Sequence, residues 1–145
     1  MFRGVSSINL DAKGRIAVPA KYRDRLVESC DSKVVVTIDL VLPCLTLFPL
    51  HHWEQLERQL QALSNTNPVY QRIKRLLLGH ASDCEIDKNG RVLIPATLRE
   101  HSNLDKSLIL AGMGNTFQIW DSSSWYDRID QDKEAQSNQH LDPEK

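Results

Sequence analysis

Apolar and polar residues follow two periods along the chain, one typical of strands and the other of helices. Short apolar or alternating runs predict strands at residues 7–10, 16–18, 34–39, 46–48, 84–86, 92–94, 107–111 and 118–120. Apolar residues at helical spacing predict a helix at 52–63 and another that starts at Asn67 and Pro68 and stops at Gly79. Shorter helices are expected after residues 19, 95 and 121. Together these elements predict an α+β fold class.

An internal repeat organises these elements. Residues 10–23 read LDAKGRIAVPAKYR, and residues 86–99 read IDKNGRVLIPATLR, with apolar positions kept apolar. We therefore expect two copies of one supersecondary unit at residues 1–63 and 81–130, joined by a connecting helix at 64–80. Strands 46–48 and 118–120 should each close the sheet of their own copy. Residues 131–145 are polar and acidic and should form a flexible tail.

Each copy contains a turn of the form Asp-x-x-Gly-Arg. Asp11 and Asp87 can accept hydrogen bonds from backbone N–H groups two residues further on, and Gly14 and Gly90 tolerate a positive φ. These four residues are expected to fix the shape of the turns.

A proline and a short helix follow each turn. Pro19 and Pro95 suit a first helical turn, where the missing N–H costs nothing. Arg23 and Arg99 should then point outward from the short helices.

Charge is distributed unevenly, although the formal net charge is only −1. Residues 1–25 hold six basic and two acidic side chains, whereas residues 121–145 hold three basic and seven acidic ones. A globally basic nucleic-acid binder is excluded, because the total charge does not attract phosphate. The basic segment at the start of the chain is nevertheless compatible with a local nucleic-acid-binding site.

Other function classes find little support. No apolar run approaches the roughly 20 residues of a membrane helix, and three cysteines without close spacing favour a reducing, cytoplasmic setting. The adjacent His51 and His52 beside Cys44 lack metal-ligand spacing, and Cys84 with His80 lacks the setting of a nucleophile pair. We expect no enzyme activity, no cofactor, no metal and no small-molecule substrate.

Two roles are open for the arginine of each turn. Arg15 and Arg91 could pair with the aspartate of their own turn and fix its shape. They could also present guanidinium donors to phosphate or to guanine O6 and N7. The roles are compatible, because an aspartate that orients an arginine leaves part of its donor fork free.

The repeated motif resembles that of the MraZ family of the AbrB-like swapped-hairpin superfamily. The resemblance rests on residues 1–4 (MFRG), the motif at 10–15, residues 75–81 (RLLLGHA), and Ile119-Trp120 followed by Trp125. It covers about residues 1–130. It implies two tandem swapped-hairpin units with a pseudo-twofold repeat, a homo-oligomeric ring, and binding to direct repeats in double-stranded DNA upstream of the division and cell-wall gene cluster.

The resemblance also implies site residues. Arg15 is the motif arginine and Lys13 its basic neighbour, while Arg91 is the equivalent residue of the second copy, where Asn89 replaces the lysine. Arg23 and Arg99 match the helix arginine of AbrB-like domains and are further DNA-contact candidates. Arg3 is a minor candidate on different grounds, its proximity in sequence to the basic turn, and a solvated terminal residue is the alternative. The structural residues of the motif are Asp11, Gly14, Pro19, Asp87, Gly90 and Pro95.

These residues lead to the hypothesis of a repressor, with two alternatives. A ring would multiply the few basic contacts of each subunit along repeated DNA and occlude a promoter, in the cytoplasm and at the nucleoid. The first alternative is an AbrB-like antitoxin, although two full copies with a short tail count against it. The second is an oligomeric interaction module that does not bind DNA.

Overall fold

The computed structural model describes residues 1–139. Its elements follow the chain as β1 (Val5–Asn9), β2 (Arg15–Ala17), α1 (Ala20–Cys30), β3 (Lys33–Ile38), β4 (Leu45–Pro49), α2 (Leu50–Gln61), α3 (Pro68–Leu77), β5 (Ser82–Glu85), β6 (Arg91–Leu93), α4 (Ala96–His101), β7 (Ser107–Gly112), β8 (Phe117–Asp121) and α5 (Ser122–Gln139). Strands and helices alternate as the sequence predicted, and the α+β fold class is confirmed.

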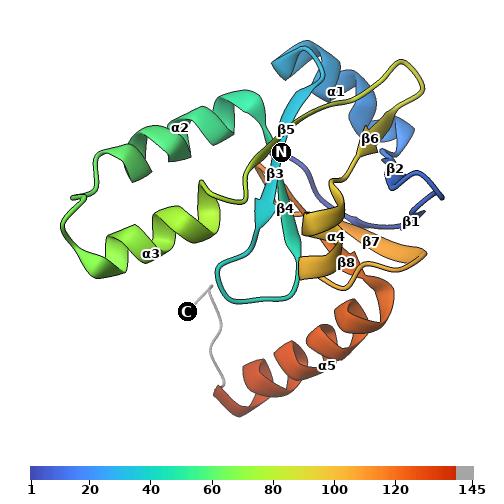
Figure 1. Cartoon of the computed structure of the whole chain (residues 1–145). Coiled ribbons are helices and arrows are strands. Elements are labelled where there is room, and N and C mark those ends of the chain that lie inside the picture. The colour runs from blue at the N-terminus through green and yellow to red at the C-terminus, as the bar shows by residue number, and fades with distance from the viewer. Residues whose placement is uncertain (140–145) are drawn as a thin grey trace.

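The strands form two antiparallel sheets that mix the two repeats (Figure 1). The larger sheet has the order β1-β7-β8-β4-β3-β5, and β2 pairs with β6 in a separate ribbon. Strand β1 of the first repeat pairs with β7 of the second, and β5 of the second pairs with β3 of the first. The expectation that each copy closes its own sheet is therefore wrong, because the first strands are exchanged.

The main core lies where the ribbon packs against the large sheet. Ile16 of β2 lies opposite Val92 of β6, and both side chains are fully buried. Phe2, Tyr22 and Phe117 add an aromatic cluster, with ring centroids 4.4–5.9 Å apart. Burial of these side chains removes apolar surface contributed by both repeats, so that the two repeats are stabilised together.

The tryptophans belong to the packing rather than to the surface. Trp53 is buried against Phe48, and Trp120 is buried in a second, smaller cluster, where Trp125 contacts it at 5.8 Å between ring centroids. Trp125 itself is half-buried.

Helices α2 and α3 form a helical hairpin that extends to one side of the sheet (Figure 1). Asn67 caps α3 as predicted, because its side-chain oxygen accepts hydrogen bonds from the backbone N–H groups of Val69 and Tyr70. The other end of α3 is tied to β3, where the Thr37 hydroxyl donates to the Leu77 carbonyl at 2.8 Å.

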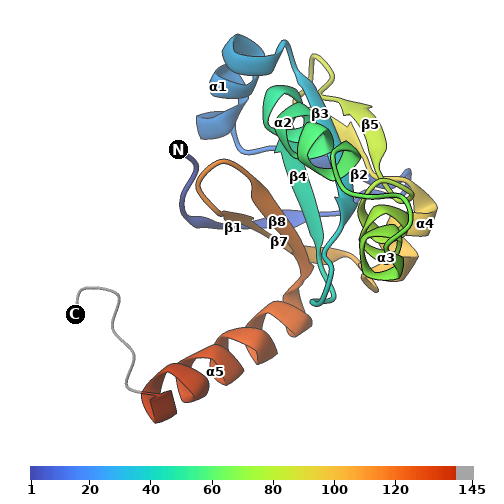
Figure 2. The same cartoon turned by 90° about the vertical axis from the view of Figure 1, so that its left-hand side faces the viewer.

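Two local predictions differ from the structure. Pro19 and Pro95 stand one residue before their helices, with ψ near 142° and 146°, so they are helix-capping positions and not first-turn residues. Residues 131–139, expected in a flexible tail, continue α5, which projects from the body (Figure 2). The rest of that predicted tail, residues 140–145, lies outside the described residues. Within residues 1–139, none of the helices combines the length and apolar character needed to cross a bilayer.

Candidate nucleic-acid interface

The two Asp-x-x-Gly-Arg segments form equivalent turns. In the first, Asp11 Oδ1 accepts hydrogen bonds from the N–H groups of Lys13 and Arg15, both at 2.9 Å. The second turn has the same bonds, from Asn89 at 2.8 Å and from Arg91 at 2.9 Å to the carboxylate of residue 87. The turn geometry predicted from the sequence is therefore confirmed.

The glycine of each turn takes a left-handed conformation. Gly14 has a φ of +85° and Gly90 a φ of +78°. A residue with a Cβ is strained at such φ values, so these positions require glycine.

The turns lead directly into the β2–β6 ribbon, which has one buried and one outer face. Arg15 lies opposite Leu93, and Ala17 lies opposite Arg91. Because side chains alternate along a strand, these four residues share the outer face, while the residues between them point into the core. The two motif arginines therefore lie diagonally across one face of a two-stranded ribbon.

A shallow hollow of about 410 Å³ lies beside this face. Its lining brings together three of the predicted contact residues, Lys13, Arg15 and Arg91, with Asp11 as the acidic residue. The other lining residues, Asn9, Ala12 and Ala17, are not among the contact residues predicted from the motif. Strand alternation from residue 15 onward is the sequence signal that would have found Ala17.

The two motif arginines differ in how they are held. Arg15 Nε donates to Asp11 Oδ2 at 2.8 Å in an ion pair, and Arg15 is half-buried. Arg91 is exposed, and no carboxylate within residues 1–139 lies at ion-pair distance from it. Of the two motif arginines, only Arg15 is therefore paired within the described residues, where its bond to Asp11 uses Nε and leaves the two Nη groups as donors.

Hydrogen bonds favour the ionised form of both turn aspartates and lower their pKa values. The backbone N–H of Arg15, followed by its guanidinium, lowers the pKa of Asp11 despite an opposing effect of desolvation. The N–H groups of Arg91 and Asn89 lower the pKa of Asp87 in the same way. A charged carboxylate accepts these bonds more strongly than a neutral one, so ionisation and turn shape support each other.

Arg23 and Arg99 do not point outward, contrary to the sequence-based expectation. Arg23 Nε donates to the carbonyl of Val18 at 2.6 Å, and Arg99 Nε donates to that of Ile94 at 3.0 Å. Both arginines are half-buried against a turn glycine of the opposite repeat. The orientation differs because the exchanged strands place each helix beside the other copy's turn.

Arg3 is not brought to this hollow. It precedes β1, whereas the turn at residues 11–14 follows the other end of that strand. Its carbonyl accepts a hydrogen bond from the Tyr22 hydroxyl, and its side chain is exposed.

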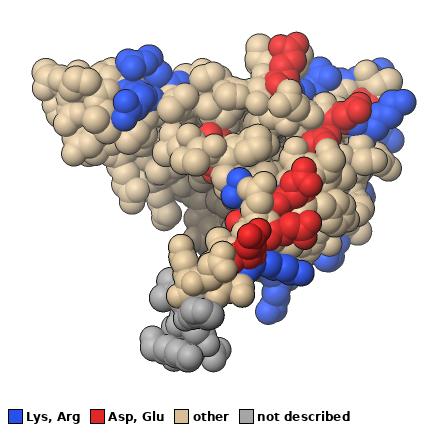
Figure 3. All heavy atoms as spheres, turned by 90° about the horizontal axis from the view of Figure 1, so that it is seen from below, with Lys and Arg blue, Asp and Glu red and all other residues tan. Residues whose placement is uncertain are grey.

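The charge distribution outside the hollow is mixed. Figure 3 shows acidic side chains in the middle of one face and most lysines and arginines toward its edges. A uniform basic surface is therefore absent from this view, in agreement with the net charge of −1.

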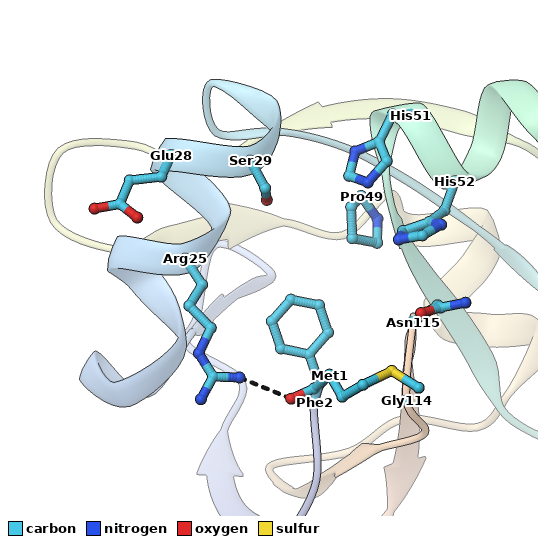
Figure 4. A pocket seen from close by; sticks show the side chains of 10 residues that line it. All are labelled: Met1, Phe2, Arg25, Glu28, Ser29, Pro49, His51, His52, Gly114 and Asn115. Carbon is cyan, nitrogen blue, oxygen red and sulfur yellow. Dashed lines mark hydrogen bonds between the residues drawn. The ribbon is translucent and has the colours of Figure 1, made fainter.

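A second hollow, of about 360 Å³, lies between α1 and the start of α2 (Figure 4). Arg25 Nη1 donates to the Met1 carbonyl at its edge at 2.7 Å, and the rings of His51 and His52 lie 4.1 Å apart. Within residues 1–139, no three His, Cys, Asp or Glu side chains converge as metal ligands would. Cys44 is buried, and desolvation raises the pKa of its thiol to about 12.

Comparison with known proteins identifies the family. The family model described as "MraZ protein, putative antitoxin-like" matches residues 1–76 and again residues 77–143. The chain belongs to the MraZ family. The resemblance inferred from the motifs is thereby confirmed, and the two matches correspond to the two repeats of the fold.

Several MraZ relatives are similar over nearly their whole length. The chain is 49% identical to a protein of Idiomarina loihiensis over 136 residues, which are 94% of this chain and 90% of the relative. It is 51% identical to a protein of Tolumonas auensis over 93% of this chain and 89% of the relative. A Klebsiella pneumoniae protein is 49% identical over 95% and 91%, respectively. All three are named "Transcriptional regulator MraZ".

Proposed function

We propose that this protein is a DNA-binding transcriptional regulator that contacts double-stranded DNA through the outer face of the β2–β6 ribbon. The observation that carries the proposal is the diagonal placement of Arg15 and Arg91 on that face, with Lys13 beside them. A two-stranded ribbon fits the major groove, and arginine forks bind phosphate or guanine edges. The names of the MraZ relatives support the same function.

The proposed mechanism depends on several subunits acting together. One ribbon offers three basic side chains, and the protein carries a net charge of −1, so a single subunit would bind weakly. A ring of identical subunits would present the ribbon at regular intervals to direct repeats in DNA. Each contact after the first would then be intramolecular, and its effective concentration would raise the overall affinity.

The regulatory role follows from where such repeats would lie. By the family resemblance, we place them upstream of the division and cell-wall gene cluster, where a bound ring would occlude the promoter. The protein would act as a repressor at the nucleoid, in the cytoplasm, without an enzymatic step. Arg3 falls outside this interface because it lies at the other end of β1.

Gel-shift titrations over a series of salt concentrations test the proposal. The wild type should bind a duplex carrying the direct repeats more tightly than a scrambled duplex. Arg15→Ala should abolish this preference, whereas Arg72→Ala, on the exposed side of α3, is the matched control and should bind as the wild type does.

Sedimentation of the same samples should give one oligomer for all three proteins. Repeat-specific binding by Arg15→Ala, or dissociation of its oligomer, would show that the assigned role of this arginine is wrong.

A further inference from the structure

We propose that Arg23 and Arg99 are positioning residues, each of which holds the DNA-contacting turn of the opposite repeat. That these turns contact DNA rests on the proposed function, whereas the holding of each turn by an arginine of the other repeat does not depend on it. It assigns these arginines a role different from the direct DNA contact that the family motif suggested.

The first contact joins Arg99 to the turn at residues 11–14. Gly14 is buried, and a Cβ built on it would lie 2.8 Å from Arg99 Cζ and 3.0 Å from both Nε and Nη2. Three neighbouring guanidinium atoms at nearly equal distances mean that the guanidinium plane lies flat against the glycine. No other residue type leaves room for this contact.

Hydrogen bonds link Arg99, Ile94 and Gly14 into a closed chain of contacts, which we call the circuit. Arg99 Nε donates to the carbonyl of Ile94 at 3.0 Å, and the N–H of Ile94 donates to the carbonyl of Gly14 at 2.9 Å. The arginine is therefore held by Ile94, the same residue that holds the turn.

The second repeat builds the same circuit with the roles exchanged. Arg23 Nε donates to the carbonyl of Val18 at 2.6 Å, and the N–H of Val18 donates to the carbonyl of Gly90 at 2.8 Å. A Cβ on Gly90 would overlap the Arg23 guanidinium, so Gly90 is also open to the arginine only because it lacks a side chain. Because the same arrangement occurs in both repeats, we regard it as a feature of the fold and not as a chance contact.

The consequence for the site is a crossed dependence. The turn that Arg99 covers carries Lys13 and leads into Arg15, whereas the turn that Arg23 covers carries Asn89 and leads into Arg91. Loss of Arg99 should therefore loosen the first repeat's turn, although Arg99 belongs to the second repeat. Direct DNA contact by Arg99 would predict no such effect in the free protein.

Amide hydrogen exchange on the free protein tests the structural part. Arg99→Lys keeps the charge and removes the planar guanidinium, and it should raise exchange at residues 13–15 while residues 89–91 stay as in the wild type. Arg23→Lys should give the opposite pattern. Arg25→Ala is the control and should change neither turn, because Arg25 lies two residues further along α1 and its guanidinium donates to the Met1 carbonyl instead.

DNA binding tests the functional part. A positioning residue should weaken binding by about two- to thirtyfold, the range for residues that act through a neighbouring element, without changing the salt dependence. A residue that contacts phosphate should instead lower the slope of log K against log salt by about 1.

The outcomes separate the two proposals. The positioning role is overturned if amide exchange rises in the turn of the arginine's own repeat, or in neither turn. It is also overturned if a variant lowers the salt slope of DNA binding while amide exchange stays as in the wild type. Crossed exchange in a protein whose wild type does not bind DNA leaves the positioning of the turns intact and overturns the proposed function alone.

Discussion

The guanidinium of Arg15 is paired with the carboxylate of Asp11 at 2.8 Å, and within residues 1–139 this pair has no equivalent in the second repeat. There, Asp87 holds its turn through backbone N–H groups only, and Arg91 extends into solvent. An arginine that is already oriented loses less side-chain freedom on binding than a mobile one. The first repeat therefore presents the better prepared of the two ribbon arginines.

Arg15→Ala should abolish repeat-specific binding, whereas Arg91→Ala should only weaken binding. A good bidentate arginine contact to a base contributes about 1–3 kcal/mol, roughly five- to 150-fold in affinity, and in the proposed ring this loss is repeated at every subunit. The exposed Arg91 should behave as a phosphate contact, so its loss should reduce the salt slope by about 1 and affect all sequences alike. Titrations on repeat and scrambled duplexes at several salt concentrations measure both effects. Equal losses for the two variants would contradict the asymmetry.

Asp11→Asn should weaken DNA binding although it removes a negative charge from the interface. The amide oxygen can still accept the N–H groups of Lys13 and Arg15, but the ion pair that orients the arginine is lost. Asp87→Asn is the matched control, because Asp87 makes no such pair within the described residues, and it should leave affinity unchanged or raise it slightly. Tighter binding by Asp11→Asn would show that its charge matters more than its orienting role.

Acid should destabilise the protein partly through the two turn aspartates. The pKa values of Asp11 and Asp87 are lowered in the folded state, chiefly by the backbone N–H groups of Arg15 and Arg91. The unfolded chain therefore binds more protons at low pH, and this stabilisation is present above the ordinary aspartate pKa of 3.8. It should be lost as the pH falls through the lower folded-state values.

Urea midpoints between about pH 5 and pH 2 measure this loss. The double variant Asp11→Asn with Asp87→Asn should show a flatter dependence on pH over that interval. An unchanged dependence would mean that other carboxyl groups determine the acid sensitivity.

Thr37→Val should loosen the attachment of α3 to the sheet. The Thr37 side chain is fully buried, and its hydroxyl donates to the Leu77 carbonyl at 2.8 Å. Its removal deprives a carbonyl at the end of α3 of a partner and should cost about 1–3 kcal/mol in the free energy of unfolding. Urea denaturation measures this cost. Thr97→Val, at an exposed position of α4, should change the midpoint little.

Cys44 should be the slowest of the three thiols to react with a disulfide reagent. Burial, and then the charge of Asp39, raise the pKa of Cys44 to about 12, so the thiolate is scarce at neutral pH. Cys30 and Cys84 are only partly buried. Time-resolved labelling with peptide mass spectrometry measures the order in which the three cysteines react. Unfolding in urea should abolish the difference between them. Labelling of native Cys44 as fast as Cys30 would contradict the burial argument.

The sequence by itself determined the features that depend on neighbours along the chain. The repeat, the Asp-x-x-Gly-Arg turns and the Asn67 cap all follow from short-range hydrogen bonds and backbone preferences. The same motif located Lys13, Arg15 and Arg91, three of the residues that line the hollow. Local patterns suffice for these residues because the turn and the strand after it are adjacent in the chain.

Only the tertiary structure decided which strands pair and where two of the predicted arginines point. The two repeats carry nearly the same apolar pattern, so β1 offers similar backbone groups to a strand of either copy. Pairing of β2 with β6 buries Ile16 against Val92 and brings each helix arginine onto the opposite glycine. Such contacts join residues far apart in the chain and depend on the burial of both repeats together, which no local pattern records.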